Sequence, residues 1–222
     1  MALLEVHRAA DRFLSRAPGV QTRHSFSFGP HYDPANTSFG PLVLHDEHVL
    51  EPGGGFGPHP HQGVHVVSWV LEGLLVHEDP VGGVHELGPG SLQHLSAGRG
   101  TVHSERAATV PTRFVQAWLR SPELAAPPSY AVTGPAPAGL APVLEVAGSV
   151  LHAGRLRPGE CAHLGGSAAL VHAFVAAGRV TAGGERLAEG DAVRCRTAPL
   201  ELRAEAPAEL LVWEMQVTQP QE

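Results

Sequence analysis

The sequence contains no lysine and no isoleucine, and it has only two cysteines among its 222 residues. We attribute the missing lysine and isoleucine to codon bias in a GC-rich genome. The cysteines are Cys161 and Cys195, and we expect them to be reduced, partly buried thiols rather than a disulfide. That expectation fits a protein of a reducing compartment.

An excess of basic charge and long hydrophobic runs are also missing. The chain has 15 basic and 22 acidic residues, for a formal net charge of −7, which argues against direct, non-specific binding to nucleic acid. No apolar run is long enough to span a membrane. The first residues lack the basic segment and apolar core of a signal peptide. We therefore expect a cytoplasmic protein that binds neither nucleic acid directly nor a membrane.

Glycine and proline are abundant, with 26 and 20 residues, and hydrophobic residues make up 43% of the chain. This composition is typical of many short strands joined by tight turns. Phe26 and Phe28 alternate as in a strand, and residues 63–73 read as a buried strand. The segment from Asp79 to Gly83 is a hairpin signal between two further strands. The sequence therefore predicts an all-β fold of the sandwich or barrel type.

The chain has 15 histidines, and only those at paired spacing indicate a metal site. His59 and His61 form a first pair, and His103 and Glu105 form a second pair. Residues i and i+2 of a strand point to the same face, so two such pairs on neighbouring strands would converge. Three imidazoles and one carboxylate suit a first-row transition metal such as iron, copper, nickel or manganese. The alternative is ordinary surface or core histidines with satisfied hydrogen bonds.

The second half of the chain repeats this organisation weakly after the proline-rich segment Ser121–Pro142. Arg203 and Glu205 fall at the positions of the second pair, and Cys161 with His163 is the nearest equivalent of the first. Because this set of ligands is only partial, we expect the second half to be structural.

The two pairs stand in longer strings that resemble a known family. The strings are His-Pro-His with Val-Leu-Glu-Gly at residues 70–73, and Ser-Ala-Gly-Arg-Gly-Thr-Val-His-Ser-Glu at residues 96–105. They resemble pirin and the bacterial pirin-like proteins of the cupin superfamily. The resemblance implies a bicupin, that is, two tandem antiparallel β-barrels of the jelly-roll type. Residues 1–125 would bind the metal, and residues 126–222 would lack a complete metal site.

The resemblance also implies a function. The metal would be a single divalent ion held by His59, His61, His103 and Glu105, most often Fe(II), with Cu, Ni, Mn or Zn as alternatives. Some bacterial members are quercetin 2,3-dioxygenases, so we expect cleavage of a flavonol-like or other enolic substrate with O₂. Glu105 is our candidate for the base that takes the substrate proton. The alternative is a regulatory protein with little turnover that binds a protein partner, as animal pirin does.

Other residues are weaker candidates. His65 stands where related sequences usually have Glu, and it shares parity with the first pair. It is a hydrogen-bonding or proton-transfer group beside the ligands, or a fifth ligand, or a packed interior histidine bonded to a backbone carbonyl. Gln116 is a candidate pocket donor, with core or rim placement as the alternative, and His94 stays unassigned. The aromatic residues Phe26, Phe28 and Trp69 could line the site or belong to the core.

Overall fold

The computed structural model describes residues 4–135, 137–165, 169–196 and 199–216. This part of the chain consists of strands and one short 3₁₀ turn, η1 (Ala9–Asp11), and it contains no α-helix. The predicted all-β class is confirmed. None of the helical structure in the described ranges is long and apolar enough to cross a membrane.

The chain divides into two compact units, one made of Phe13–Pro135 and the other of Met1–Arg12 with Ala136–Glu222. The first strand, β1 (Leu4–His7), pairs with β19 (Ala192–Arg196), so it belongs to the unit that holds the second half of the chain.

At the other end of the expected N-terminal domain, β12 (Ser129–Thr133) pairs with β9 (Leu92–Ser96). By strand pairing, β12 therefore belongs to the Phe13–Pro135 unit, although it follows residue 125. β1 precedes residue 125 and belongs to the other unit.

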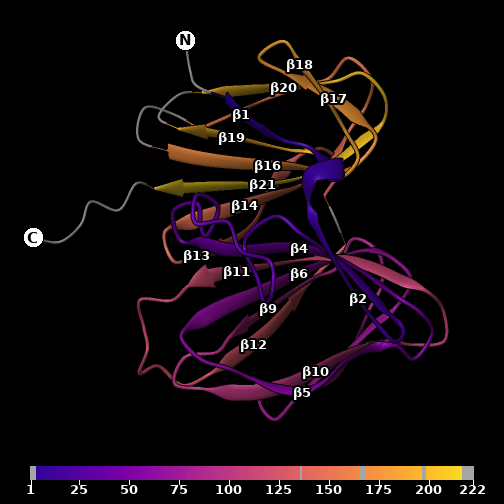
Figure 1. Cartoon of the computed structure of the whole chain (residues 1–222), viewed down its shortest axis with the longest axis vertical. Coiled ribbons are helices and arrows are strands. Elements are labelled where there is room, and N and C mark those ends of the chain that lie inside the picture. The colour runs from indigo at the N-terminus through magenta and orange to yellow at the C-terminus, as the bar shows by residue number, and fades with distance from the viewer. Residues whose placement is uncertain (1–3, 136, 166–168, 197–198, 217–222) are drawn as a thin grey trace, which may run out of the picture. The chain divides into compact units, whose positions relative to one another are not determined.

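The Phe13–Pro135 unit contains a seven-stranded and a four-stranded antiparallel sheet (Figure 1). The strand order is β12-β9-β6-β11-β4-β3-β2 in the first and β5-β10-β7-β8 in the second. The remaining strands are β2 (Phe13–Ala17), β3 (Val20–His24), β4 (Leu42–Leu50), β5 (Gly55–His61), β6 (Val64–Glu72), β7 (Leu75–Asp79), β8 (Gly83–Leu87), β10 (Thr101–Ala107) and β11 (Thr112–Arg120).

The other unit repeats this plan with a six-stranded sheet, β1-β19-β16-β21-β14-β13, and a four-stranded sheet, β15-β20-β17-β18. The strands not yet placed are β13 (Ala141–Val146), β14 (Ser149–Leu156), β15 (Cys161–Leu164), β16 (Ala169–Ala177), β17 (Arg179–Ala182), β18 (Glu185–Ala188), β20 (Leu200–Ala204) and β21 (Ala208–Gln216).

The strand predicted at Phe26 and Phe28 is wrong, because β3 ends at His24. Beyond it the backbone closes on itself: the Ser27 N–H donates to the Asn36 carbonyl, and Phe28 exchanges two hydrogen bonds with His31. These local bonds take the groups that would have joined a sheet. Phe26 is buried, whereas 43% of the Phe28 surface is exposed.

The predicted hairpin is present as β7 and β8, and Asp79 closes its turn. The Asp79 Oδ1 atom accepts the backbone N–H groups of Val81, at 2.6 Å, and Gly82, at 2.7 Å. An aspartate that binds the backbone two or three residues ahead is a common turn device. One side of the hairpin packs on a core cluster of Leu50, Val70, Leu75, Leu87, Ala107 and Phe114.

Two glycines with positive φ stand before and inside this hairpin, Gly73 (φ 80°) and Gly83 (φ 87°). A Cβ at Gly73 would collide with the Pro111 carbonyl oxygen, whereas a Cβ at Gly83 would meet nothing within 4 Å. We expect Gly83→Ala to lower the free energy of unfolding by about 1–2 kcal/mol, the cost of a left-handed backbone. Gly73→Ala should cost about 1–3 kcal/mol more, through overpacking.

Urea unfolding of both variants measures the difference. Equal losses would show that the close approach of Pro111 does not restrict residue 73.

Candidate metal centre

The pairing of β5 with β10 brings the first pair opposite the second. In the antiparallel register His103 lies across from His59, and Thr101 lies across from His61. Side chains of β10 alternate between buried and more exposed positions, so His103 and Glu105 share the buried face. The ring centroids of His59 and His103 are 4.4 Å apart, and His61 lies 4.7 Å from His103. Three imidazoles therefore meet, as the spacing predicted.

The Nε2 atoms of His59, His61 and His103 have the properties of metal ligands. His59 Nδ1 donates to the Gly57 carbonyl oxygen at 2.8 Å, which leaves its Nε2 as the lone-pair nitrogen. The Nε2 atoms of His61 and His103 are buried and have no hydrogen-bond partner. Burial, and then the neighbouring imidazoles, lower the pKa of His61 to about 4 and that of His103 to about 3. Neutral rings with buried, unpaired nitrogens fit a divalent transition metal.

Glu105 lies at the same face, but its carboxylate does not group with all three histidines. The ligand atoms of His59, His61 and His103 lie within 4.8 Å of one another, and a second, overlapping group consists of His77, His103 and Glu105. Glu105 is 1% exposed. Among described residues, the two groups of candidate ligands therefore overlap at His103.

Three side chains direct hydrogen-bond donors at the Glu105 carboxylate. Gln93 Nε2 donates to Oε1, and Gln116 Nε2 donates to Oε2 at 2.8 Å. Ser68 Oγ also donates to Oε1, at 3.3 Å. Gln116, which the sequence suggested as a pocket donor, thus contacts the predicted ligand directly.

Each glutamine is held in this orientation by an aromatic donor. The Trp118 indole N–H donates to Gln116 Oε1 at 2.8 Å, and the Tyr130 hydroxyl donates to Gln93 Oε1 at 2.9 Å. Burial raises the pKa of Tyr130, and the charges of Glu105 and Asp79 raise it further, so the hydroxyl keeps its proton. Because each amide oxygen is taken, each NH₂ group faces Glu105.

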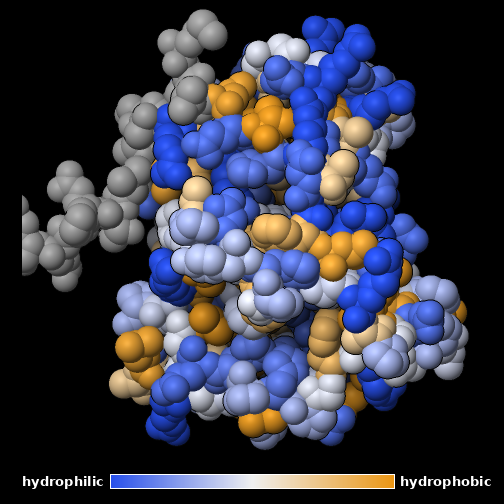
Figure 2. Space-filling model, in the orientation of Figure 1, coloured by the Kyte–Doolittle hydropathy of each residue, from blue (hydrophilic) through white to orange (hydrophobic). Residues whose placement is uncertain are grey.

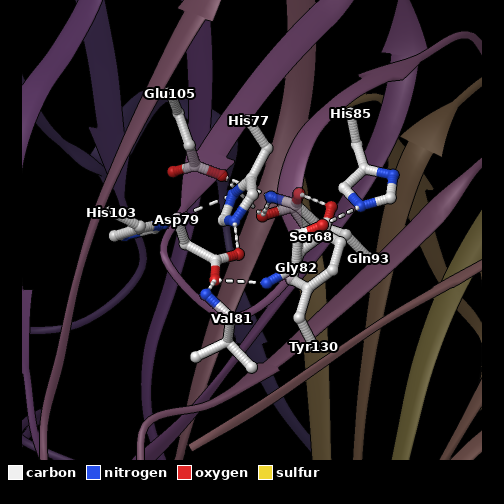
Figure 3. Close-up of polar contacts among 10 residues, drawn as sticks. All are labelled: Ser68, His77, Asp79, Val81, Gly82, His85, Gln93, His103, Glu105 and Tyr130. Atoms are coloured by element: carbon white, nitrogen blue, oxygen red, sulfur yellow. Dashed lines mark hydrogen bonds and ion pairs between the residues drawn. The ribbon is translucent and has the colours of Figure 1, made fainter.

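His77 belongs to the site, and sequence reasoning missed it. It lies on β7 directly across from Glu105 in the β7–β10 ladder. Its Nδ1 is 3.4 Å from Nδ1 of His103, and its Nε2 is 2.6 Å from Oδ2 of Asp79 (Figure 3). The available signal was the i, i+2 spacing of His77 and Asp79, the same pattern that identified the other pairs.

Asp79 is an ionised acceptor in this arrangement. Burial alone would raise its pKa, but hydrogen bonds from Gly82, His77 and Val81 lower the pKa below its usual value. The side chains of His77 and Asp79 are both fully buried.

His65 does not join the three imidazoles. Its Nδ1 lies 3.1 Å from Nε2 of His94, and neither residue belongs to a metal-binding group found among described residues. His65 is therefore placed as an interior histidine that is hydrogen-bonded to another side chain rather than to a backbone carbonyl.

A cavity of about 440 Å³ opens beside the site. His59, Glu105 and Gln116 contribute to its lining. Phe28 also lines it, whereas Phe26 and Trp69 are core residues with 1% and 2% exposure. The other lining residues are Thr22, His24, Leu44, Asp46, His48, Gly55, Phe56, Gly57 and Trp118.

The second unit has the same strand register without the ligands. Cys161 of β15 lies across from Arg203 of β20, just as His59 lies across from His103. Within the described ranges, both groups that could hold a metal lie in the Phe13–Pro135 unit. Neither cysteine forms a disulfide; Cys161 is exposed and Cys195 is buried.

Comparison with known proteins identifies the family of this chain. The family model named Pirin matches residues 6–119, which is about half of the chain. A Mycobacterium tuberculosis protein named "Putative quercetin 2,3-dioxygenase" is 41% identical over 234 residues, covering 96% of each chain. The chain belongs to the pirin family. The quercetin 2,3-dioxygenase of Escherichia coli is 32% identical over 130 residues, which cover 58% of this pirin and 56% of that protein.

A solved structure extends the match over both units of this pirin. It is the bacterial pirin YhhW of Escherichia coli in complex with nickel(II), with a TM-score of 0.92 and 26% identity. The match covers 97% of this chain and 100% of that chain. That neighbour contains a metal ion, and its fold is shared over 97% of this chain.

The hydrogen-bonded pair of His65 and His94 predicts a pH dependence of stability. Burial lowers the pKa of His94 to about 4, with a smaller contribution from His65, so the unfolded chain binds more protons between pH 6.5 and 4. The free energy of unfolding should therefore fall as the pH falls from 6.5 to 4. In His94→Gln this slope should be shallower by up to one proton.

Urea unfolding of metal-free protein at several pH values measures the slope. His163→Gln, at an exposed histidine, is the matched control and should keep the wild-type slope. An unchanged slope in His94→Gln would contradict the prediction.

Proposed function

We propose that this pirin is a metal-dependent dioxygenase that cleaves a flavonol-like or other enolic substrate with O₂. The observation that carries the proposal is the cavity of about 440 Å³, which is lined by Phe28, Phe56 and Trp118 and reaches His59 and Glu105. Its volume lies in the range of small-molecule pockets, about 300–1,000 Å³. Aromatic side chains at that position suit a planar aromatic ligand. The relatives named as quercetin 2,3-dioxygenases support the same substrate class.

In this proposal the Nε2 atoms of His59, His61 and His103 would hold the metal, and the Glu105 carboxylate, which groups with His103 in the structure, would complete the ligand set. The metal would be Fe(II), with Cu, Ni, Mn or Zn as alternatives, and the nickel-bound neighbour supports a divalent ion. Such an ion would supply Lewis-acid chemistry toward the enolic oxygen and the electrons for the reaction with O₂.

The protein side chains supply the base and the shape of the pocket. Glu105 would accept the proton of the enolic hydroxyl, because it is the carboxylate residue that lines the cavity beside His59. Gln93 and Gln116 keep that carboxylate in place. Phe28 and Trp118, whose rings meet edge to face at 5.8 Å, orient the substrate and exclude water.

We also propose that the two units are the tandem cupin barrels of a bicupin, with the metal in Phe13–Pro135 alone. The same plan of one large and one four-stranded sheet in each unit supports this assignment. So does the equivalent register of β5 with β10 and of β15 with β20.

Oxygen uptake by Fe(II)-loaded protein in the presence of quercetin tests the proposal. We expect His103→Ala to lose the uptake together with the metal. Glu105→Gln should keep the fold and lose at least about 100-fold in turnover, the share of a positioned base. Val102→Ala changes an exposed neighbour on the same strand and should behave as wild type.

No uptake above the His103→Ala background, in wild-type protein that holds its iron, would contradict the dioxygenase proposal. A metal-dependent regulatory protein would then be the better account. On the face drawn in Figure 2, hydrophobic residues of the described chain form small patches among polar ones.

A further inference from the structure

Behind His103, on the side away from His59 and His61, a row of buried polar groups ends in a carboxylate. Figure 3 shows the row, in which His103 contacts His77 and His77 contacts Asp79. The Nδ1 atoms of His103 and His77 are 3.4 Å apart, and His77 Nε2 is 2.6 Å from Asp79 Oδ2. Asp79 Oδ1 accepts the backbone N–H groups of Val81 and Gly82. His103, His77 and Asp79 are not among the residues that line the cavity.

The Asp79 carboxylate determines which nitrogen of each histidine in this row carries the hydrogen. Asp79 is an acceptor on both oxygens, so His77 Nε2 carries the hydrogen. With its Nε2 hydrogen donated to Asp79, His77 has Nδ1 left as the acceptor that faces His103. His103 Nδ1 must donate to it, which leaves His103 Nε2 without a hydrogen. That Nε2 atom is the one that is buried without a partner.

We propose that Asp79 and His77 are positioning residues that fix the His103 tautomer so that Nε2 presents its lone pair to a divalent transition metal. The inference rests on the metal site proposed above. A histidine ligand commonly donates its other N–H to a carboxylate or carbonyl, and this contact fixes the ring. Here a second imidazole stands between the ligand and the carboxylate.

The surroundings of His77 show that its orientation is fixed. The Tyr130 ring stacks on it with a centroid distance of 4.4 Å and an interplanar angle of 17°. His77 is also fully buried, so water does not compete for its nitrogens. The His77 ring therefore links the hydrogen bond at Asp79 to the tautomer of His103.

The substitution Asp79→Asn keeps the shape of the side chain and should reverse the direction of the hydrogen bonds from residue 79 through His77 to His103. The Val81 and Gly82 N–H groups require an oxygen, so the new NH₂ group must face His77. His77 Nε2 then becomes the acceptor and Nδ1 the donor, and His103 receives its hydrogen on Nε2. An aspartate-to-asparagine change that forces the wrong histidine tautomer is severe in other enzymes.

Two measurements test this chain of hydrogen bonds. In metal-free protein, long-range ¹H–¹⁵N NMR should show His103 protonated on Nδ1 in wild type and on Nε2 in Asp79→Asn. The affinity for Ni(II), measured by calorimetry, should fall about 10- to 100-fold in Asp79→Asn. Glu78→Gln removes the same charge from the neighbouring, exposed position of β7 and should leave both readouts at wild-type values.

The wild-type His103 tautomer and affinity in a folded Asp79→Asn variant would overturn the proposal. If that variant does not fold, His77→Phe replaces it, because a ring that can stack on Tyr130 is kept and the acceptor for His103 Nδ1 is removed. His77→Phe should lose the single His103 tautomer and bind Ni(II) more weakly. An unchanged tautomer there would overturn the proposal as well.

These outcomes are separable from a failure of the metal site itself. If wild-type protein bound no Ni(II), or if His59→Ala bound it as well as wild type, the proposed metal site would fail. The NMR result on metal-free protein would still decide whether Asp79 sets the His103 tautomer.

Discussion

The antiparallel pairing of β5 with β10 is the constraint on which the rest of the site depends. It sets His59 across from His103 and brings His61 within the same cluster of rings. Two buried imidazole nitrogens are left there without a partner, on His61 and His103. Buried polar atoms without partners are costly, so the cluster is stabilised when a cation occupies its centre.

The other polar groups of this unit fix the direction in which each candidate ligand points. The Gly57 carbonyl holds His59, the pair of His77 and Asp79 stands behind His103, and two glutamines hold Glu105. The contacts to His59 and His103 use the Nδ1 atom of each ring and leave Nε2 for the centre. A site assembled in this way has little left to rearrange when a metal binds, which is the usual requirement for tight and specific binding.

Sequence reasoning reached the strand pattern and the convergence of His59, His61 and His103, because both follow from the two-residue period of a strand. It did not reach His77, although His77 and Asp79 have the same spacing. Asp79 also had a turn role that explained it, so its second oxygen was overlooked.

The two-residue period was insufficient at two other places: it was wrong at Phe26 and Phe28, and it left the alternatives for His65 open. The period of two that predicted a strand at Phe26 and Phe28 was overridden by local backbone bonds with His31 and Asn36. His65 has the parity expected of a residue at the site, but β6 lies in the seven-stranded sheet and the metal ligands lie on β10 and β5 of the four-stranded sheet. Parity gives the face of a strand and leaves the choice of sheet open.

The overlapping groups of the structure make the position of the metal the most direct test of the whole account. Crystals of the Ni(II)-loaded protein, with data collected at the nickel absorption edge, would locate the ion by its anomalous signal. We predict one peak, within bonding distance of the Nε2 atoms of His59, His61 and His103. A peak between His77, His103 Nδ1 and Glu105 would contradict the assignment of the ligands and of His77 as a positioning residue.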